Sequence, residues 1–109
     1  TGSPMYVVKI DPQSNQITLG PEDALFRRDL WASKMYFTSG KTPVGPLNVT
    51  AKIRYKASES TATLTPRGEW AEVRFKEPQR AVTPGQAVVF YNGEEVVGGG
   101  ITELESPAL

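Results

Sequence analysis

Six cations in the middle of the chain are spaced for contact with an anionic backbone: Lys52, Arg54, Lys56, Arg74, Lys76 and Arg80. The first three stand two residues apart, so an extended strand would present them on one face. If the strand carrying Arg74 and Lys76 were its neighbour, the combined patch could neutralise backbone phosphates without reading bases. The alternative is an ordinary solvated face of a half-buried sheet.

Charge is balanced over the whole chain but not along it. Twelve Lys and Arg equal twelve Asp and Glu, so no strong overall field attracts an anionic partner. Residues 50–80 hold seven cations against four carboxylates, whereas residues 81–109 hold four Glu and neither Lys nor Arg. Any attraction for a polyanion must therefore be local.

The residue types present in the chain argue against catalysis. The chain has no Cys and no His, which removes disulfides, zinc sites built on these ligands, cysteine nucleophiles and histidine-dependent triads. No nucleophile–base pair stands out among the other side chains, and Glu94-Glu95 is interpreted as a solvated edge. We therefore expect no catalytic residue, no metal and no cofactor in this chain. We also expect no membrane contact, because no stretch approaches the roughly 18 apolar residues of a membrane span.

Seven residues are predicted to form turns or close backbone approaches: Pro84, Gly85, Asn92, Gly93, Gly98, Gly99 and Gly100. The Pro-Gly pair fits a type II turn, and the Asn-Gly pair predicts a hairpin with a type I′ turn. The apolar run between them, residues 87–91, predicts a strand buried on both faces or a strand of a closed barrel. The glycine triplet implies a bulge, a barrel corner or a close approach of two backbones, and it lacks the following helix of a phosphate-binding loop.

The residues named above are expected to be positioned by β-strands. Strands are predicted over residues 5–10, 16–20, 21–33, 34–37, 47–55, 61–65, 69–75, 87–91 and 94–102. Residues 21–33 also carry marks of a helical turn, but we prefer a strand. The Pro-Arg-Gly stretch at 66–68 predicts a hairpin loop of three to four residues. Alternation places Val49, Ala51 and Ile53 on one face of their strand, opposite Lys52.

Short strands without a helical period predict an all-β fold. The preferred architecture is a small closed antiparallel β-barrel, and a β-sandwich is the alternative. Residues 21–104 are assigned to the barrel, residues 1–5 to an expression remnant and residues 105–109 to a frayed tail. The aromatic residues that could stack on bases are interpreted as core: Trp31, Tyr36, Phe37, Trp70 and Tyr91.

Four stretches of the chain carry a family resemblance: YVVKID from Tyr6, AKIRY from Ala51, EPQRAVTPGQAVVFYNGE from Glu77 and VVGGGI from Val96. Together they resemble the C-terminal part of bacterial-type tRNA-specific 2-thiouridylases. The part running from PQRAV to VVFY, followed by the glycine triplet, is the most specific. The resemblance implies a barrel similar to those of aminomethyltransferases and elongation factor Tu.

The resemblance also implies a parent enzyme with an N-terminal ATP-pyrophosphatase domain and a central domain. Such enzymes activate the wobble uridine of tRNA with ATP and deliver sulfur to carbon 2 from a cysteine persulfide. This chain has neither the Ser-Gly-Gly-Val-Asp-Ser nucleotide loop nor the cysteines. It also lacks the Gly-Gln-Arg-Lys-Gly-Leu motif that ordinarily precedes YVV, so residues 6–20 are expected to be the tail of the central domain.

The partners that the resemblance implies are tRNA and the catalytic and central domains of the same chain, in the cytoplasm or in an organelle if the source is eukaryotic. Lys52, Arg54 and Arg80 fall within the matching stretches, whereas KASESTATL after Tyr55 departs from the family pattern. The alternative is a structural barrel that docks against protein without RNA contact. Its interface would be the apolar residues between Leu25 and Phe37.

Overall fold

The computed structural model describes residues 5–11, 13–20, 26–53, 59–80, 82 and 84–106. Its strands are β1 (Tyr6–Asp11), β2 (Gln16–Gly20), β3 (Phe26–Phe37), β4 (Leu47–Lys52), β5 (Ser60–Arg67), β6 (Trp70–Arg80), β7 (Ala87–Asn92) and β8 (Glu95–Glu103). The preference for strand over helix is confirmed from Phe26 onward, and β3 also absorbs the separate strand predicted at 34–37. In this described part of the chain, no helix is long and apolar enough to cross a membrane.

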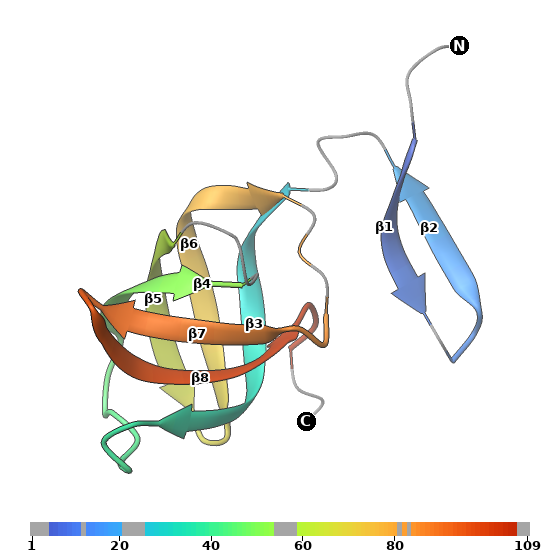
Figure 1. The fold of residues 1–109 in the computed structure, drawn as a ribbon. Coiled ribbons are helices and arrows are strands. Elements are labelled where there is room, and N and C mark those ends of the chain that lie inside the picture. The colour runs from blue at the N-terminus through green and yellow to red at the C-terminus, as the bar shows by residue number, and fades with distance from the viewer. Residues whose placement is uncertain are drawn as a thin grey trace.

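Six strands close into a barrel in the order β3-β6-β5-β4-β7-β8, with β8 returning to β3 (Figure 1). Every neighbouring pair is antiparallel. The closed antiparallel barrel is therefore confirmed in preference to the sandwich. Closure leaves no unpaired strand edge in this sheet.

The barrel interior is filled by small and branched apolar side chains with two phenylalanines. The buried apolar residues are Leu30, Ala32, Val49, Ala51, Ile53, Ala62, Leu64, Ala71, Val73, Phe75, Val88 and Phe90. The predicted alternation of the strands at 47–55 and 69–75 is thus confirmed for their described residues. In β7 the inward residues are buried while Val89 and Tyr91 on the outer face are half-buried, as in a closed-barrel strand.

Most of the aromatic residues expected in the core, namely Trp31, Tyr36, Trp70 and Tyr91, lie instead on the outer wall. Trp31, Phe37, Trp70 and Tyr91 are half-buried, and the side chain of Tyr36 is 54% exposed. The rings of Trp31 and Trp70 meet edge to face with their centroids 6.5 Å apart. Phe37 packs against the core cluster, as expected. The expectation was wrong for the other four, because each falls on the outward side of its strand.

Strands β1 and β2 form a two-stranded antiparallel sheet of their own, outside the barrel (Figure 1). The predicted hairpin is confirmed, and its turn places Asn15 at a φ of 56°, a conformation that asparagine tolerates better than most residues. Three apolar side chains of this hairpin are exposed, namely Val7 (49%), Ile17 (61%) and Leu19 (55%). The hairpin therefore presents apolar surface that its own sheet does not cover.

Of three predicted turns, the first has the expected backbone conformation and the other two differ from the prediction. Gly85 has a φ of 88°, as the third position of a type II turn requires, and its N–H donates to the Thr102 carbonyl at 2.7 Å. The hairpin at Asn92 is confirmed, but Asn92 is the last residue of β7 and pairs with Glu95, so the loop is Gly93-Glu94. Positive φ at Gly93 alone fits a II′ turn rather than I′. The loop after Arg67 is likewise two residues rather than three to four.

The three consecutive glycines of β8 lie buried against β3, and we call this contact the glycine seam. A Cβ at Gly98 would collide with the carbonyl oxygen of Tyr36. A Cβ at Gly100 would lie 2.7 Å from the Ser33 carbonyl oxygen, also closer than real side chains approach. The predicted close backbone approach is confirmed, and it coincides with an irregular pairing of β3 and β8 between Ser33 and Tyr36.

Candidate functional site

The strand order separates the cations that were expected to form one patch. Strand β5 lies between β4 and β6, so Lys52 and the pair Arg74 and Lys76 are not on neighbouring strands. The assumption of adjacency was wrong because spacing along one strand carries no information about which strand pairs with it. The outer side chains of β5 therefore decide what lies between the cations.

One row of polar side chains crosses four strands of the outer wall. Asn48 of β4 pairs with Thr63 of β5, Thr63 pairs with Arg74 of β6, and Arg74 pairs with Asp29 of β3. Thr63 and Arg74 lie between buried neighbours, and Asn48 and Asp29 each have a buried residue on one side, so the four side chains face outward. Two residues along β6, on the same face, lies the exposed Lys76. Two residues back along β5 lies the exposed Thr61.

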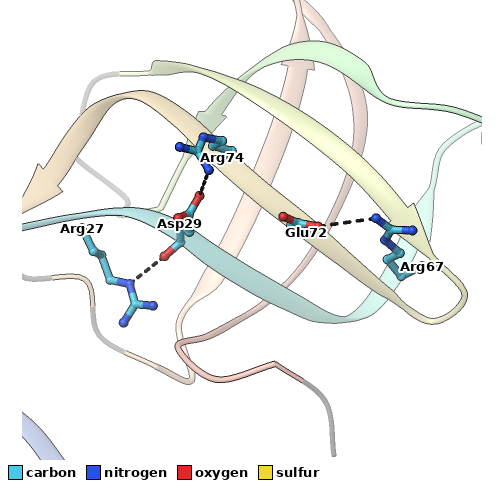
Figure 2. A network of polar contacts seen from close by, with 5 residues as sticks. All are labelled: Arg27, Asp29, Arg67, Glu72 and Arg74. Carbon is cyan, nitrogen blue, oxygen red and sulfur yellow. Dashed lines mark hydrogen bonds and ion pairs between the residues drawn. The ribbon is translucent and has the colours of Figure 1, made fainter. Parts of the chain in front are cut away.

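An irregularity in the pairing of β3 with β6 adds Arg28 to this wall. Arg27 pairs with Gln79 and Asp29 with Arg74, which leaves Arg28 without a regular partner where the register shifts. The Arg27 side chain fixes this segment, because its Nε donates to the Asp29 carbonyl oxygen at 2.6 Å (Figure 2). Its Nη2 also donates to the Leu104 carbonyl oxygen at 2.9 Å. Bulges of this kind commonly redirect a side chain beside a functional site.

These side chains line an open groove of about 430 Å³, which we call the polar groove. Its lining residues are Arg28, Asn48, Thr61, Ala62, Thr63, Arg74, Phe75 and Lys76. Ala62 and Phe75 are buried residues of the core, so the groove lies directly over the barrel interior. The remaining six are polar or cationic, and none of these described lining residues is a carboxylate.

The electrostatics of the groove are set by three cations and one nearby carboxylate. Arg74 Nη1 lies 3.4 Å from Asp29 Oδ1, with the two side chains 62% and 52% exposed (Figure 2). Such an exposed pair contributes about 0–1 kcal/mol to folding and leaves guanidinium hydrogens available to a ligand. Within the described residues, Arg28 and Lys76 form no ion pair. The groove thus carries excess positive charge in a chain whose net charge is zero.

The sequence-predicted contacts divide into three groups. Arg74 and Lys76 line the polar groove. Lys52 is half-buried at the end of β4 and Arg80 exposed at the end of β6, and neither is among the lining residues. Arg54 and Lys56 lie outside the described residues.

Four groove residues were missed at the level of sequence: Arg28, Asn48, Thr61 and Thr63. The two threonines had a readable signal, since they alternate with buried Ala62 and Leu64 along β5. The position of Arg28 had none, because only the register shift against β6 brings it to the groove. The guanidinium, carboxamide and hydroxyl groups of these four residues can bind anions and other polar groups.

Reactive arrangements are not found where the structure describes the chain. Within these ranges, no group of three or more carboxylate, His or Cys side chains is placed to hold a metal ion. Thr102 has a hydroxyl that is fully buried without a hydrogen-bond partner, but it faces the barrel interior rather than the groove. The cationic and neutral polar side chains of the polar groove make it a candidate binding site.

Comparison with known proteins places the barrel in a defined family of sequences. Residues 27–102 match the model of the aminomethyltransferase beta-barrel domain. The chain is 46% identical over 112 residues to tRNA-specific 2-thiouridylase MnmA of Chlorobium luteolum, covering 98% of this chain and 30% of that protein. The protein of the same name from Roseiflexus castenholzii is 50% identical over 101 residues, with 92% and 27% covered.

A third relative with this name, from Pelotomaculum thermopropionicum, is 48% identical over 103 residues, covering 94% of this chain and 28% of the relative. The chain thus matches nearly throughout its own length but spans less than a third of each relative. The barrel-family match begins at residue 27, so the β1–β2 hairpin lies outside it.

Proposed function

Because this chain belongs to the aminomethyltransferase β-barrel domain family and corresponds to the C-terminal domain of tRNA-specific 2-thiouridylases, we propose that it holds tRNA for a parent enzyme. The parent would perform ATP-dependent 2-thiolation of the wobble uridine. The polar groove is the observation that carries this proposal, since it gathers Arg28, Arg74 and Lys76 with no carboxylate among its described lining residues. Such cations neutralise phosphates and fix the register of a bound nucleic acid, without reading its sequence.

In this proposal the barrel is not the catalytic part. ATP binding and sulfur transfer belong to the remaining two-thirds or more of the parent enzyme, which this chain does not span. The parent would act where tRNA is found, in the cytoplasm of a bacterium or in an organelle of a eukaryotic cell. Lys52, Arg54, Lys56 and Arg80 stay predictions as further phosphate contacts outside the groove.

The exposed apolar side chains of the β1–β2 hairpin support a second partner within the same proposal. Val7, Ile17 and Leu19 are each about half exposed or more, and apolar surface of this kind favours protein contact. We assign this hairpin to the tail of the central domain, docking against the other domains of its own chain. In the competing hypothesis, docking is the sole role and RNA is not touched.

The docking surface would not be the segment between Leu25 and Phe37 as a whole. Leu30 and Ala32 are completely buried in the barrel, so they cannot also face a partner. Phe26 and Tyr36 at the two ends of β3 are exposed, but they are separated by the length of that strand. The hairpin is therefore the better candidate for protein contact.

Removal of two groove cations tests the RNA proposal. We expect Arg74→Ala with Lys76→Ala to weaken binding of an in vitro transcribed tRNA to the 109-residue chain. The slope of log affinity against log salt concentration should fall in magnitude by about 1.5, because fewer counterions are released on binding when two phosphate contacts are lost. Fluorescence anisotropy titrations at several salt concentrations measure both quantities.

A matched control separates the groove from net charge. Arg67→Ala with Lys41→Ala removes the same two residue types from exposed positions outside the groove. We expect this pair to keep most of the affinity and the salt slope of the original chain. Equal losses in the two double variants, or no loss in either, would reject the groove as the tRNA contact and favour the docking hypothesis.

A further inference from the structure

The two halves of the polar groove offer different chemistry. The side formed by β3 and β6 carries the cations Arg28, Arg74 and Lys76. The side formed by β4 and β5 carries a carboxamide and two hydroxyls, from Asn48, Thr61 and Thr63. A ligand that fills the groove would therefore meet charge along one edge and neutral hydrogen-bonding groups along the other.

The neutral groups of the groove are available to a ligand. Thr50 donates to Glu59 Oε1 at 2.7 Å, and Ser60 donates to Gln79 Oε1 at 3.2 Å, so the neighbouring hydroxyls are already engaged. By contrast, no side-chain hydrogen bond within the described residues occupies Thr61, Thr63 or Asn48. These three face solvent, and each can both donate and accept.

The spacing of these groups fits a nucleotide chain lying along the strands. Residues two apart on a strand are separated by about 6.6 Å, which suits consecutive phosphates or consecutive sugars. Thr63 is the direct cross-strand neighbour of Arg74, and the backbones of neighbouring strands lie about 4.8 Å apart. A hydroxyl on one strand and a cation on the next can therefore contact the sugar and the phosphate of the same nucleotide.

We infer that the polar groove binds a ribose–phosphate strand and distinguishes RNA from DNA through the 2′-hydroxyl. The phosphates lie against Arg28, Arg74 and Lys76, and the 2′-hydroxyls exchange hydrogen bonds with Thr61, Thr63 and Asn48. The 2′-hydroxyl is the group that allows a protein to recognise RNA at a given site. The inference rests on the proposed function, because it concerns how the same groove holds tRNA.

The described lining of the groove offers no exposed aromatic ring on which a base could stack. Phe75 is the sole aromatic residue of this described lining, and its side chain is 2% exposed. Recognition is therefore independent of base sequence and depends on the sugar. The preference for RNA should be modest, because water can replace a lost hydrogen bond in an open groove. Two such bonds correspond to about tenfold in affinity.

The first test changes the nucleic acid and leaves the protein intact. Anisotropy titrations of the 109-residue chain compare an RNA hairpin, a DNA hairpin of the same sequence and the RNA hairpin with 2′-O-methyl groups. We expect about tenfold weaker binding of the DNA hairpin and a clear loss with the methylated RNA. The methylated hairpin keeps the A-form shape, so equal affinity for the two RNA probes would reject the inference and indicate recognition of shape alone.

The second test removes the hydroxyls of β5. Thr61→Val with Thr63→Val keeps the branched shape and the strand preference but loses both hydroxyls. We expect RNA affinity to fall to the level of DNA, while DNA affinity and the salt slope stay unchanged. The control Thr65→Val lies further along the same outward face, paired with Glu72, and should leave all three quantities unchanged.

The outcomes separate this inference from the proposed function. If the double valine variant retains the preference for RNA, or loses affinity for RNA and DNA equally, the hydroxyls do not read the ribose. The groove then still holds tRNA, provided that the Arg74 and Lys76 variants change the salt slope. If the valine variant does not fold, Thr61→Ser with Thr63→Ser replaces it, and loss of the RNA preference despite retained hydroxyls contradicts the inference.

Discussion

The polar groove and the glycine seam lie on opposite edges of the same strand. On one edge β3 pairs with β6, and a register shift after Arg27 brings Arg28 into the groove. On the other edge β3 pairs with β8, and a register shift after Ser33 accompanies the close approach of Gly98, Gly99 and Gly100. The irregularity between β3 and β6 brings the Arg28 side chain to the surface of the groove. The irregularity between β3 and β8 leaves no room for a side chain at the three glycines.

This difference separates residues that bind from residues that hold the barrel closed. In the seam, backbone atoms touch backbone atoms, so added side-chain volume must displace a strand. In the groove, side chains project into solvent, so their replacement changes what the surface attracts and little else. Substitution of the seam glycines is therefore expected to lower stability, whereas substitution of the groove residues is expected to change binding and leave stability nearly unchanged.

The largest expected effect is in the seam. Gly98→Ala should lower the free energy of unfolding by about 3 kcal/mol, because its Cβ would collide with the Tyr36 carbonyl oxygen, which cannot rotate away. Urea denaturation followed by tryptophan fluorescence measures the loss. Gly45→Ala is the control, since a Cβ there meets no atom within 4 Å. Equal stability of the two variants would show that the seam is not closely packed.

A smaller loss of stability is expected for substitutions of Gly93, and it distinguishes the effect of crowding from that of backbone conformation. Gly93 lies in open space but has a φ of 65°, whereas Gly98 is crowded without a positive φ. Gly93→Ala should cost about 1 kcal/mol, the penalty of left-handed backbone for an L-residue. Gly93→Asn should cost less, because asparagine tolerates this region. The same denaturation measurement checks both, and a cost for alanine as large as that of Gly98→Ala would remove the distinction.

The smallest expected effect on stability is in the groove. Arg74→Ala and Lys76→Ala should each change the free energy of unfolding by less than about 0.5 kcal/mol, because both side chains are exposed and the ion pair of Arg74 with Asp29 is solvated. The same variants should weaken tRNA binding. A large loss of stability would contradict the comparison, since the groove would then also support the fold.

Prediction from sequence succeeded where a rule depends on local geometry. Alternation identified the inward residues of β4 and β6, and the Pro-Gly and Asn-Gly pairs identified two turns between strands. The exact position of the second turn failed by one residue, because pairing of Asn92 with Glu95 extends β7 beyond the expected end. The prediction failed for Trp31, Trp70 and Tyr91 for another reason: their hydrophobicity suggests burial, but alternation along the strand places them outward, next to buried residues.

The amino-acid sequence by itself determined the all-β class, the outward position of Arg74, Lys76, Thr61 and Thr63, and the close approach at the glycine triplet. These follow from alternation along a strand and from the space that a missing Cβ allows. Tertiary structure alone decided that β5 separates β4 from β6 and that Arg28 joins the groove. Strand order and register depend on contacts between residues distant in the chain, and no pattern within one strand specifies its partner.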